Sequence, residues 1–265
     1  MTTEIFKRHR ELLSGIHEFI VNSCKVVYWH DGRASSPKPV RGGSCFILRF
    51  HDKLVGVTAD HVVKLYRSEK ARVSTLVCQL WNIAFQLADR IIDQDAALDI
   101  ATFDVSEREL SQIGGNEIDC RGAWPPPDPQ VGNIISIVGF PELERQVYGN
   151  HSADFRSYVG MTVVDGISDR EIMTTYDPNR DHDLSGVAGL PPLRLNLSGC
   201  SGGPVLLHTD QNGVYRWNAV GLIASGPGDS PEGETSQFDL IRIRRIHFIK
   251  EDGTLIKLDQ GWLPP

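Results

Sequence analysis

The chain has 265 residues, of which 40% are hydrophobic and 23% are charged, and its formal net charge is −7. This length accommodates one large or two small globular cores, and the composition excludes extensive disorder. The negative charge argues against a general nucleic-acid binder, and we interpret the one basic cluster, Arg242–Arg245, as a solvated face.

The N-terminal residues 3–21 place apolar side chains at helical spacing, which predicts an amphipathic helix. Charged residues interrupt this segment, so it is neither a signal core nor a membrane span. Apolar runs bounded by turn residues then predict strands at 25–29, 44–50, 53–57, 73–80 and 99–105.

Two titratable residues lie at the ends of these predicted strands. His61 follows the apolar run 54–57 in a short turn, and Asp99 begins the strand 99–105. A histidine oriented by a buried carboxylate is the base that activates a serine nucleophile. Asp93 and Asp95 are alternative carboxylates, but they belong to a more polar run.

The second half of the chain begins after a proline-rich stretch. Residues 114–130 contain the run Trp124-Pro125-Pro126-Pro127 and predict a stiff connection. Further strands are predicted at 134–141, 155–164, 170–176, 203–208 and 219–224, and residues 238–258 predict a closing strand or helix.

No cofactor or metal site is predicted. The acidic stretch 177–183 begins like a calcium loop, but His182 occupies its sixth position and Ala188 its twelfth. We therefore interpret it as a surface loop. The chain has no nucleotide-binding glycine motif. Its odd set of cysteines has no repeated close spacing, so neither a zinc site nor a dense disulfide framework is expected: Cys24, Cys45, Cys78, Cys120 and Cys200.

The most informative stretch is Gly199-Cys200-Ser201-Gly202-Gly203-Pro204. A serine between glycines is typical of a nucleophile that carries its own oxyanion hole. The backbone N–H groups of Gly199 and Ser201 can converge on a developing negative charge only if Gly199 adopts a conformation that a Cβ would hinder.

Together, these motifs resemble the chymotrypsin/trypsin-like serine proteases. Thr58-Ala59-Asp60-His61 resembles the family's Thr-Ala-x-His box, Asp99-Ile100-Ala101 its Asp-(Ile/Leu)-Ala strand, 42–47 its early Gly-Gly/Ser strand and 199–204 its nucleophile loop. The order His, Asp, Ser is also the same. The stretch Gly139-Phe140-Pro141 is similar to the Gly-Tyr-Pro turn of the bacterial HtrA-like branch.

The resemblance implies an all-β fold of two six-stranded antiparallel β-barrels, preceded by the N-terminal helix. The expected division is 1–23 for the helix, 24–113 for the first barrel, 114–130 for the connection and 131–265 for the second barrel with a C-terminal segment. His61 and Asp99 then belong to the first barrel and Ser201 to the second.

The implied activity is hydrolysis of peptide bonds by a serine endopeptidase. His61 is the expected base, Asp99 orients it, Ser201 attacks, and the N–H groups of Gly199 and Ser201 bind the oxyanion. The expected partner is a peptide or protein substrate, and no binding of nucleic acid or membrane is expected. The sequence leaves open whether a protein partner activates the enzyme.

The same resemblance implies substrate contacts and two departures. The stretch Ile223-Ala224-Ser225 resembles the edge that pairs with substrate backbone. Leu195 stands where trypsin-like enzymes place an acidic residue, which predicts a small or apolar residue before the cleaved bond. Cys200 replaces the aspartate that pairs with a cleaved N-terminus, so activation by such cleavage is not expected.

Two alternatives remain open. The Gly-x-Ser-x-Gly pattern also fits the elbow of α/β-hydrolases, although there a helix follows the serine and the histidine comes last. The other alternative is a catalytically silent or gated barrel that binds extended peptides or a protein partner.

The cysteine positions bear on the expected location. Secreted members of the family close the histidine loop with a disulfide bond, whereas here no cysteine closely flanks His61. We therefore expect a soluble, reduced, cytoplasmic protein.

Overall fold

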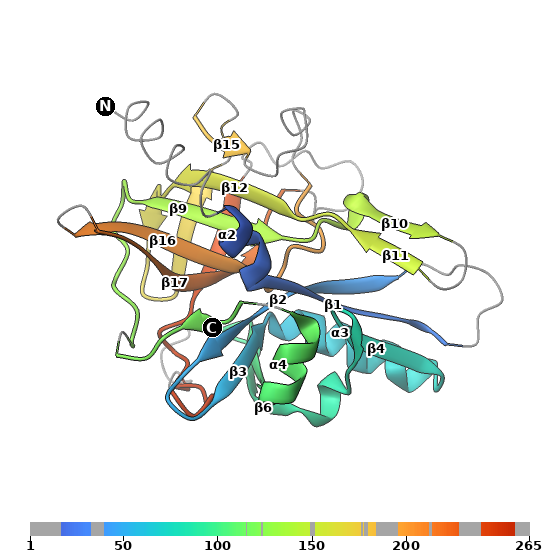
Figure 1. Ribbon diagram of the computed structural model, residues 1–265. Coiled ribbons are helices and arrows are strands. Elements are labelled where there is room, and N and C mark those ends of the chain that lie inside the picture. Colours follow the sequence, from blue (N-terminus) through green and yellow to red (C-terminus); the bar gives the residue numbers. More distant parts are fainter. Residues whose placement is uncertain are drawn as a thin grey trace, which may run out of the picture.

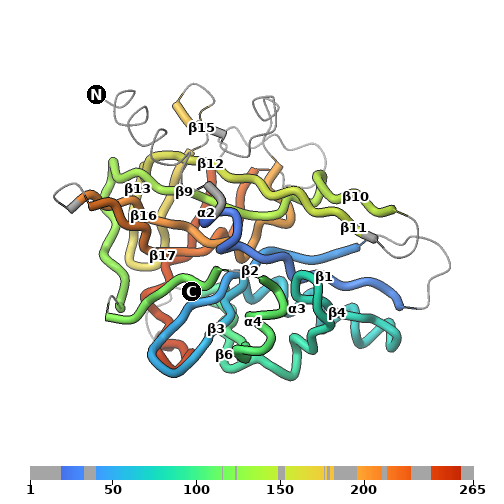
Figure 2. Tube along the Cα trace, viewed as in Figure 1, coloured from blue at the N-terminus to red at the C-terminus, as the bar shows by residue number. Residues whose placement is uncertain are grey.

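The computed structural model describes residues 17–32, 40–114, 116–122, 124–148, 152–175, 177, 180–183, 196–211, 214–227 and 240–257. These residues form two curled, mainly antiparallel β-sheets and a two-stranded hairpin (Figure 1). The first sheet lies in the lower half of this view and the second in the upper half, as the Cα trace in Figure 2 also shows.

The first sheet uses the N-terminal half of the chain. Its strands are β1 (Cys24–Asp31), β2 (Arg41–Arg49), β3 (Leu54–Thr58), β4 (Leu76–Leu80), β5 (Ile83–Ala84), β6 (Ile91–Asp95), β7 (Ile100–Val105) and β8 (Ile118–Asp119). Their spatial order is β5-β4-β1-β2-β3-β7-β6, and β8 pairs in parallel with β2. Every residue of β3 is buried, as expected for a continuous apolar run at the centre of a sheet.

The second sheet uses the C-terminal half. Its strands are β9 (Ile134–Gly139), β12 (Tyr158–Val163), β13 (Gly166–Ile167), β14 (Glu171–Thr175), β15 (His182–Asp183), β16 (Pro204–Gln211), β17 (Val214–Ser225) and β18 (Leu240–Arg245), in the spatial order β13-β14-β18-β17-β16-β9-β12-β15. Between β9 and β12, a separate hairpin of β10 (Arg145–Tyr148) and β11 (Ser152–Phe155) extends toward the right in Figure 1.

The fold class is therefore all-β with the two-sheet, chymotrypsin-like organisation that the sequence predicts. Within the described residues each sheet has eight strands instead of six, because two strands of only two residues extend each sheet. Such short strands carry no apolar alternation that a sequence could reveal. The strands predicted around residues 25–29, 44–50, 134–141 and 203–208 are confirmed by β1, β2, β9 and β16.

In the described part of the chain the helices are few and short. They are α2 (His17–Ser23), α3 (Asp60–Arg72) and α4 (Glu107–Ile113), with the 3₁₀ turns η1 (Leu87–Asp89) and η2 (Glu142–Glu144). The helix α2 is the described end of the predicted N-terminal helix. The histidine loop differs from the prediction of a short turn, because residues 60–72 form a helix that buries Val62, Val63 and Tyr66 against the first sheet.

The C-terminal segment after β18 returns to the first sheet. The Thr102 hydroxyl donates to the Gly253 carbonyl at 2.6 Å, and the Trp124 indole donates to the Ile249 carbonyl at 2.9 Å. One hydrophobic cluster contains residues from both sheets, including Val57 and Val138. This shared core fixes the two sheets relative to each other.

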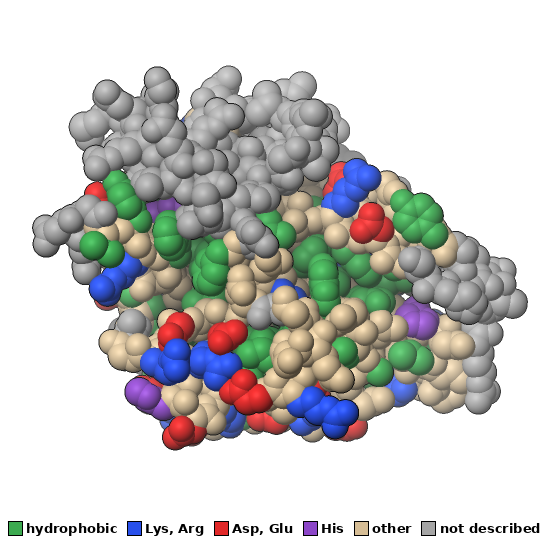
Figure 3. Space-filling view, viewed as in Figure 1, with side chains coloured by type: hydrophobic (Ala, Val, Ile, Leu, Met, Phe, Trp, Pro, Cys, Tyr) green, Lys and Arg blue, Asp and Glu red, His purple; other side chains and the backbone are tan. Residues whose placement is uncertain are grey.

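The surface carries both signs of charge. Acidic and basic side chains alternate over the lower half of the molecule in Figure 3. Among the ion pairs, Arg49 lies 2.6 Å from Glu107 and 2.7 Å from Glu117. Among the described helices, none has the length and apolar content that crossing a bilayer requires. Residues 1–16 of the predicted helix and the predicted positions Ala188 and Leu195 lie outside the described residues.

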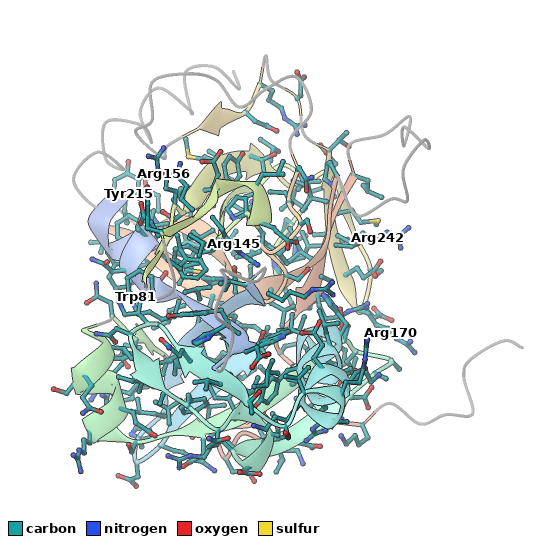
Figure 4. All side chains as sticks on the ribbon, turned by 90° about the vertical axis from the view of Figure 1, so that its right-hand side faces the viewer. Trp81, Arg145, Arg156, Arg170, Tyr215 and Arg242 are labelled. Atoms are coloured by element: carbon teal, nitrogen blue, oxygen red, sulfur yellow. The ribbon has the colours of Figure 1, made fainter. Side chains whose placement is uncertain are left out.

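The basic cluster of β18 is matched by carboxylates. Arg244 lies 3.2 Å and Arg242 3.7 Å from the carboxylate of Glu171, and Arg245 forms an ion pair with Asp128. Arg242 is labelled at the edge of the molecule in Figure 4. Only the Arg242 side chain, 53% exposed, is solvated, whereas Arg244 and Arg245 are 13% and 12% exposed, so the interpretation as a solvated face holds for Arg242 alone.

Candidate active site

The structure brings His61 and Asp99 together. His61 is the second residue of α3, and Asp99 lies in the connection between β6 and β7. The imidazole Nδ1 is 2.9 Å from Asp99 Oδ2 and 3.1 Å from Oδ1, and the His61 backbone N–H donates to Oδ1 at 3.0 Å. Since an ionised carboxylate only accepts hydrogen bonds, Nδ1 carries the proton and Nε2 is left as the basic nitrogen.

The backbone at Asp99 explains how its carboxylate reaches the histidine. Asp99 has a φ of +50°, a left-handed conformation that aspartate tolerates better than most residues. Its neighbours Leu98 and Ile100 are both fully buried, so the side chain between them is fixed in direction. The carboxylate is 21% exposed and the imidazole 49% exposed, so the histidine is open to the solvent.

The two alternative carboxylates have other partners. Asp95 Oδ1 accepts the backbone N–H groups of Ala97 and Leu98, which closes the turn before Asp99. Asp93 binds the ammonium of Lys257 at 2.7 Å. Asp99 is thus the member of this acidic run that contacts the imidazole.

The loop that contains Ser201 is shaped by its glycines. Gly199 has a φ of +90°, which favours a residue without a Cβ. A Cβ on Gly203 would lie 1.9 Å from the Val138 carbonyl oxygen, so only glycine permits this approach between the loop and β9. The loop then continues at Pro204 directly into β16, a strand. The α/β-hydrolase elbow requires a helix here, so this alternative is not supported.

Hydrogen bonds hold the Ser201 loop between the two sheets. Cys200 N–H donates to the Leu197 carbonyl at 2.8 Å, and Gly202 N–H donates to the Ile223 carbonyl at 2.8 Å. The Ser201 carbonyl accepts the backbone N–H of Ser44, from β2, at 2.9 Å. The Ser201 hydroxyl donates to the Ala224 carbonyl at 3.4 Å, a long contact that leaves it free to reorient.

A single cleft of about 510 Å³ contains the predicted site. Its lining residues are Gly42, His61, Val62, Leu65, Asp99, Glu142, Ser198, Gly199, Ser201, Ala224 and Ser225. His61, Ser201 and Gly199 therefore line the same cleft.

The predicted substrate edge is only partly at the cleft. Ala224 and Ser225 line it, but Ile223 does not: its side chain is 1% exposed, its N–H donates to Gly203 and its carbonyl accepts from Gly202. The structure therefore does not place Ile223 with the other predicted substrate residues, because its backbone groups are already paired. A break in register between Ile223 and Ser225 turns Ala224 toward the cleft.

The sequence did not identify three residues around this cleft. Ser44 receives the Phe140 N–H at 3.0 Å and donates to the Gly199 carbonyl at 3.0 Å. Glu142 lines the cleft, and Arg145 is buried behind it. The Gly-Gly-Ser motif could have identified Ser44 as a residue near the site. The pair Glu142 and Arg145 follows a predicted strand, and nothing in the sequence marks it as part of the site.

No metal site accompanies the cleft: no group of three or more His, Cys, Asp or Glu side chains converges in the parts of the chain that the structure describes. All five cysteines are buried and unbridged. Burial raises the pKa of the Cys24 thiol to about 12, so this group behaves as an apolar side chain near neutral pH.

Comparisons with known proteins concern the fold. No protein-family model and no curated protein matches the chain. Among solved structures, Deg5 is 18% identical with a TM-score of 0.45, covering 82% of this chain and 86% of that one. The thermostable serine protease AL20 from an extremophilic microorganism is 12% identical with a TM-score of 0.41, covering 84% and 91%.

A third similar chain comes from a structure on the coupled folding and binding of the intrinsically disordered Sesbania mosaic virus VPg protein. It is 13% identical with a TM-score of 0.40, covering 83% of this chain and 85% of that one. At these identities and TM-scores the three similarities carry no argument about function, which rests on the residues of the cleft.

Proposed function

We propose that the protein is a serine endopeptidase related to the trypsin-like, HtrA-like branch of proteases. The observation that carries this proposal is the imidazole of His61, bound through Nδ1 to Asp99 in the same cleft as Ser201. A domain that only binds peptides has no physical need for an oriented base beside a serine in a glycine turn. A bacterial cytoplasmic location belongs to the same proposal.

The proposed reaction has two acyl-transfer steps. Ser201 Oγ leaves the Ala224 carbonyl, passes its proton to His61 Nε2 and bonds to the carbonyl carbon of the scissile peptide. The imidazolium, stabilised by Asp99, then donates this proton to the leaving amine as the C–N bond breaks. Water then hydrolyses the ester: His61 takes a proton from water, the water oxygen bonds to the acyl carbon, and the ester C–O bond to Ser201 Oγ breaks. The acid product leaves, and His61 returns the proton to Ser201 Oγ.

The oxyanion of each tetrahedral intermediate is assigned to the N–H groups of Gly199 and Ser201. Neither group donates a backbone hydrogen bond within the described residues, and both belong to residues that line the cleft. A preorganised donor of this kind contributes about 3 kcal/mol of transition-state stabilisation. An extended substrate would run beside Ala224 and Ser225. The preference for a small or apolar residue, based on Leu195, remains part of the proposal.

The proposal is tested by covalent labelling with a fluorophosphonate probe, read as intact mass. The wild-type protein is expected to gain one adduct, and Ser201→Ala is expected to gain none while keeping its thermal unfolding midpoint. Ser111→Ala, which removes an exposed serine on α4, is the matched control and is expected to label like the wild type. An adduct on Ser201→Ala would contradict the assignment of the nucleophile.

The gated or silent barrel remains the second candidate because the Ser201 hydroxyl donates to the Ala224 carbonyl in this structure. If this state persists, a folded protein gives no adduct and binds peptides without cleaving them. Titration of an extended peptide library against the unlabelled protein, followed by mass analysis of the peptides, separates binding from turnover.

A further inference from the structure

Arg145 is a buried cation directly behind the cleft. It is the first residue of β10, and its side chain is only 4% exposed. Figure 4 labels it near the middle of the molecule, above the first sheet. Burying a guanidinium costs several kcal/mol unless its N–H groups find hydrogen-bond acceptors. The contacts of Arg145 therefore indicate why it is buried here.

The guanidinium joins two segments that approach from different sheets. Its Nη1 donates to the carbonyl of Val40, the residue before β2, at 3.2 Å, and its Nη2 donates to the carbonyl of Gly42, in β2, at 3.3 Å. It also contacts the Phe155 ring, with 6.0 Å between the guanidinium carbon and the ring centroid. Arg145 therefore links the hairpin to the wall of the cleft that contains Gly42.

The same guanidinium packs against the glycine turn of the proposed oxyanion hole. A Cβ on Gly199 would lie 2.6 Å from Arg145 Nη2, so Nη2 occupies the space next to this glycine. The turn cannot shift toward the hairpin while Arg145 is in place. The backbone of Gly199 is thus confined on one side by a rigid, charged group.

Glu142 completes the arrangement from the preceding 3₁₀ turn. Its Oε1 lies 3.8 Å from Arg145 Nη1, and its Oε2 accepts the Ser198 hydroxyl at 3.3 Å. Its backbone N–H donates to the Ser198 carbonyl at 2.7 Å. This last bond directs the Ser198 carbonyl toward the hairpin and away from the oxyanion site, so the N–H of Gly199 in the same peptide unit is directed oppositely.

We infer that Arg145, together with Glu142, is a positioning residue that fixes the Ser198–Gly199 peptide in the orientation needed for oxyanion binding. This inference rests on the proposed function. Burial lowers the pKa of the Arg145 guanidinium from its ordinary value, although the nearby Glu142 carboxylate opposes this effect. The group nevertheless keeps its charge at neutral pH.

Arg145→Met tests this inference, because methionine retains much of the apolar stem but donates no hydrogen bond. The second-order rate constant for fluorophosphonate labelling is expected to fall about 100-fold, the effect of losing one oxyanion donor. Arg145→Lys keeps the charge but lacks the two donor groups of the guanidinium, and its labelling rate constant is expected to lie between those of the wild type and Arg145→Met. Arg121→Met, which removes an exposed arginine paired with Asp119, is the matched control and is expected to label normally.

Two NMR signals separate positioning from general damage. The low-field proton on His61 Nδ1 is expected to stay in Arg145→Met, because the contact with Asp99 is not touched. The amide proton of Glu142 is expected to exchange with solvent at least tenfold faster than in the wild type, because its bond to Ser198 loosens. Arg121→Met is expected to change neither signal.

The exchange measurement does not depend on turnover. If the wild-type protein fails to label, the proposed function fails, but faster exchange at Glu142 in Arg145→Met still supports the positioning of the turn. Unchanged exchange at Glu142, or labelling of Arg145→Met at the wild-type rate, overturns the inference.

Discussion

Replacing Asp99 by asparagine tests the proposed catalytic arrangement with the smallest change of shape. In the native site one carboxylate oxygen accepts the His61 backbone N–H at 3.0 Å, and the other faces Nδ1 at 2.9 Å. The asparagine amide has only one accepting oxygen. If that oxygen keeps the bond to the backbone, the amide nitrogen faces Nδ1 and donates to it.

The consequence is a change of tautomer. With Nδ1 accepting a hydrogen bond, the ring proton moves to Nε2, which can no longer take the proton from Ser201. The same substitution in a Ser-His-Asp triad lowers the rate about 10,000-fold. At 1.36 kcal/mol for each factor of ten, this corresponds to about 5 kcal/mol of lost transition-state stabilisation.

The assay is the second-order rate constant for fluorophosphonate labelling at pH 7.5, measured with the thermal unfolding midpoint. The midpoint of Asp99→Asn is expected to fall by only about 4 °C or less, because the amide keeps the bond to the His61 backbone and reverses the direction of the bond to Nδ1. Asp95→Asn, which changes the neighbouring turn carboxylate, is the control and is expected to label within a few-fold of the wild type. Labelling of Asp99→Asn within tenfold of the wild-type rate refutes the reasoning.

Three further predictions concern stability and reactivity. All five cysteines are buried and the pKa of Cys24 is raised to about 12, so iodoacetamide at pH 8 is expected to alkylate none in the native protein and five after unfolding, as measured by intact mass. Burial raises the pKa of Asp93, but hydrogen bonds led by Lys257 outweigh it and the net pKa is lowered. The ionised Asp93 carboxylate therefore stabilises the folded protein. Its contribution to the free energy of unfolding is present above the unfolded pKa of about 4 and is lost as the pH falls through the folded pKa. Denaturant titrations at pH 7 and pH 3 are therefore expected to show a smaller acid-induced loss in Asp93→Asn than in the wild type, and an equal loss would contradict this account. Gly203→Ala places a Cβ 1.9 Å from the Val138 carbonyl oxygen and is expected to lower the unfolding midpoint by more than 5 °C, whereas an unchanged midpoint in a thermal scan would show that this backbone contact relaxes freely.

The helices show how far local sequence signals reach. Helix α4 begins with a capping box in which Ser106 and Glu109 bond reciprocally, and this signal is present in the sequence. Helix α3 begins at an Ala59 N-cap without a side-chain hydrogen bond, so the usual start signal is absent. Its position after a strand predicted a turn, and packing of its apolar side against the first sheet decided the helix instead.

The sequence by itself determined the long strands, the order of His61, Asp99 and Ser201, and the need for glycine at position 199. These features follow from local apolar patterns and from the chemistry of single side chains. The tertiary structure alone decided that Ile223 is withdrawn from the cleft and that Arg145 lies behind the glycine turn. The physical reason is that these outcomes depend on contacts between segments far apart in the chain, and no local pattern encodes which distant groups will satisfy a buried charge or a backbone donor.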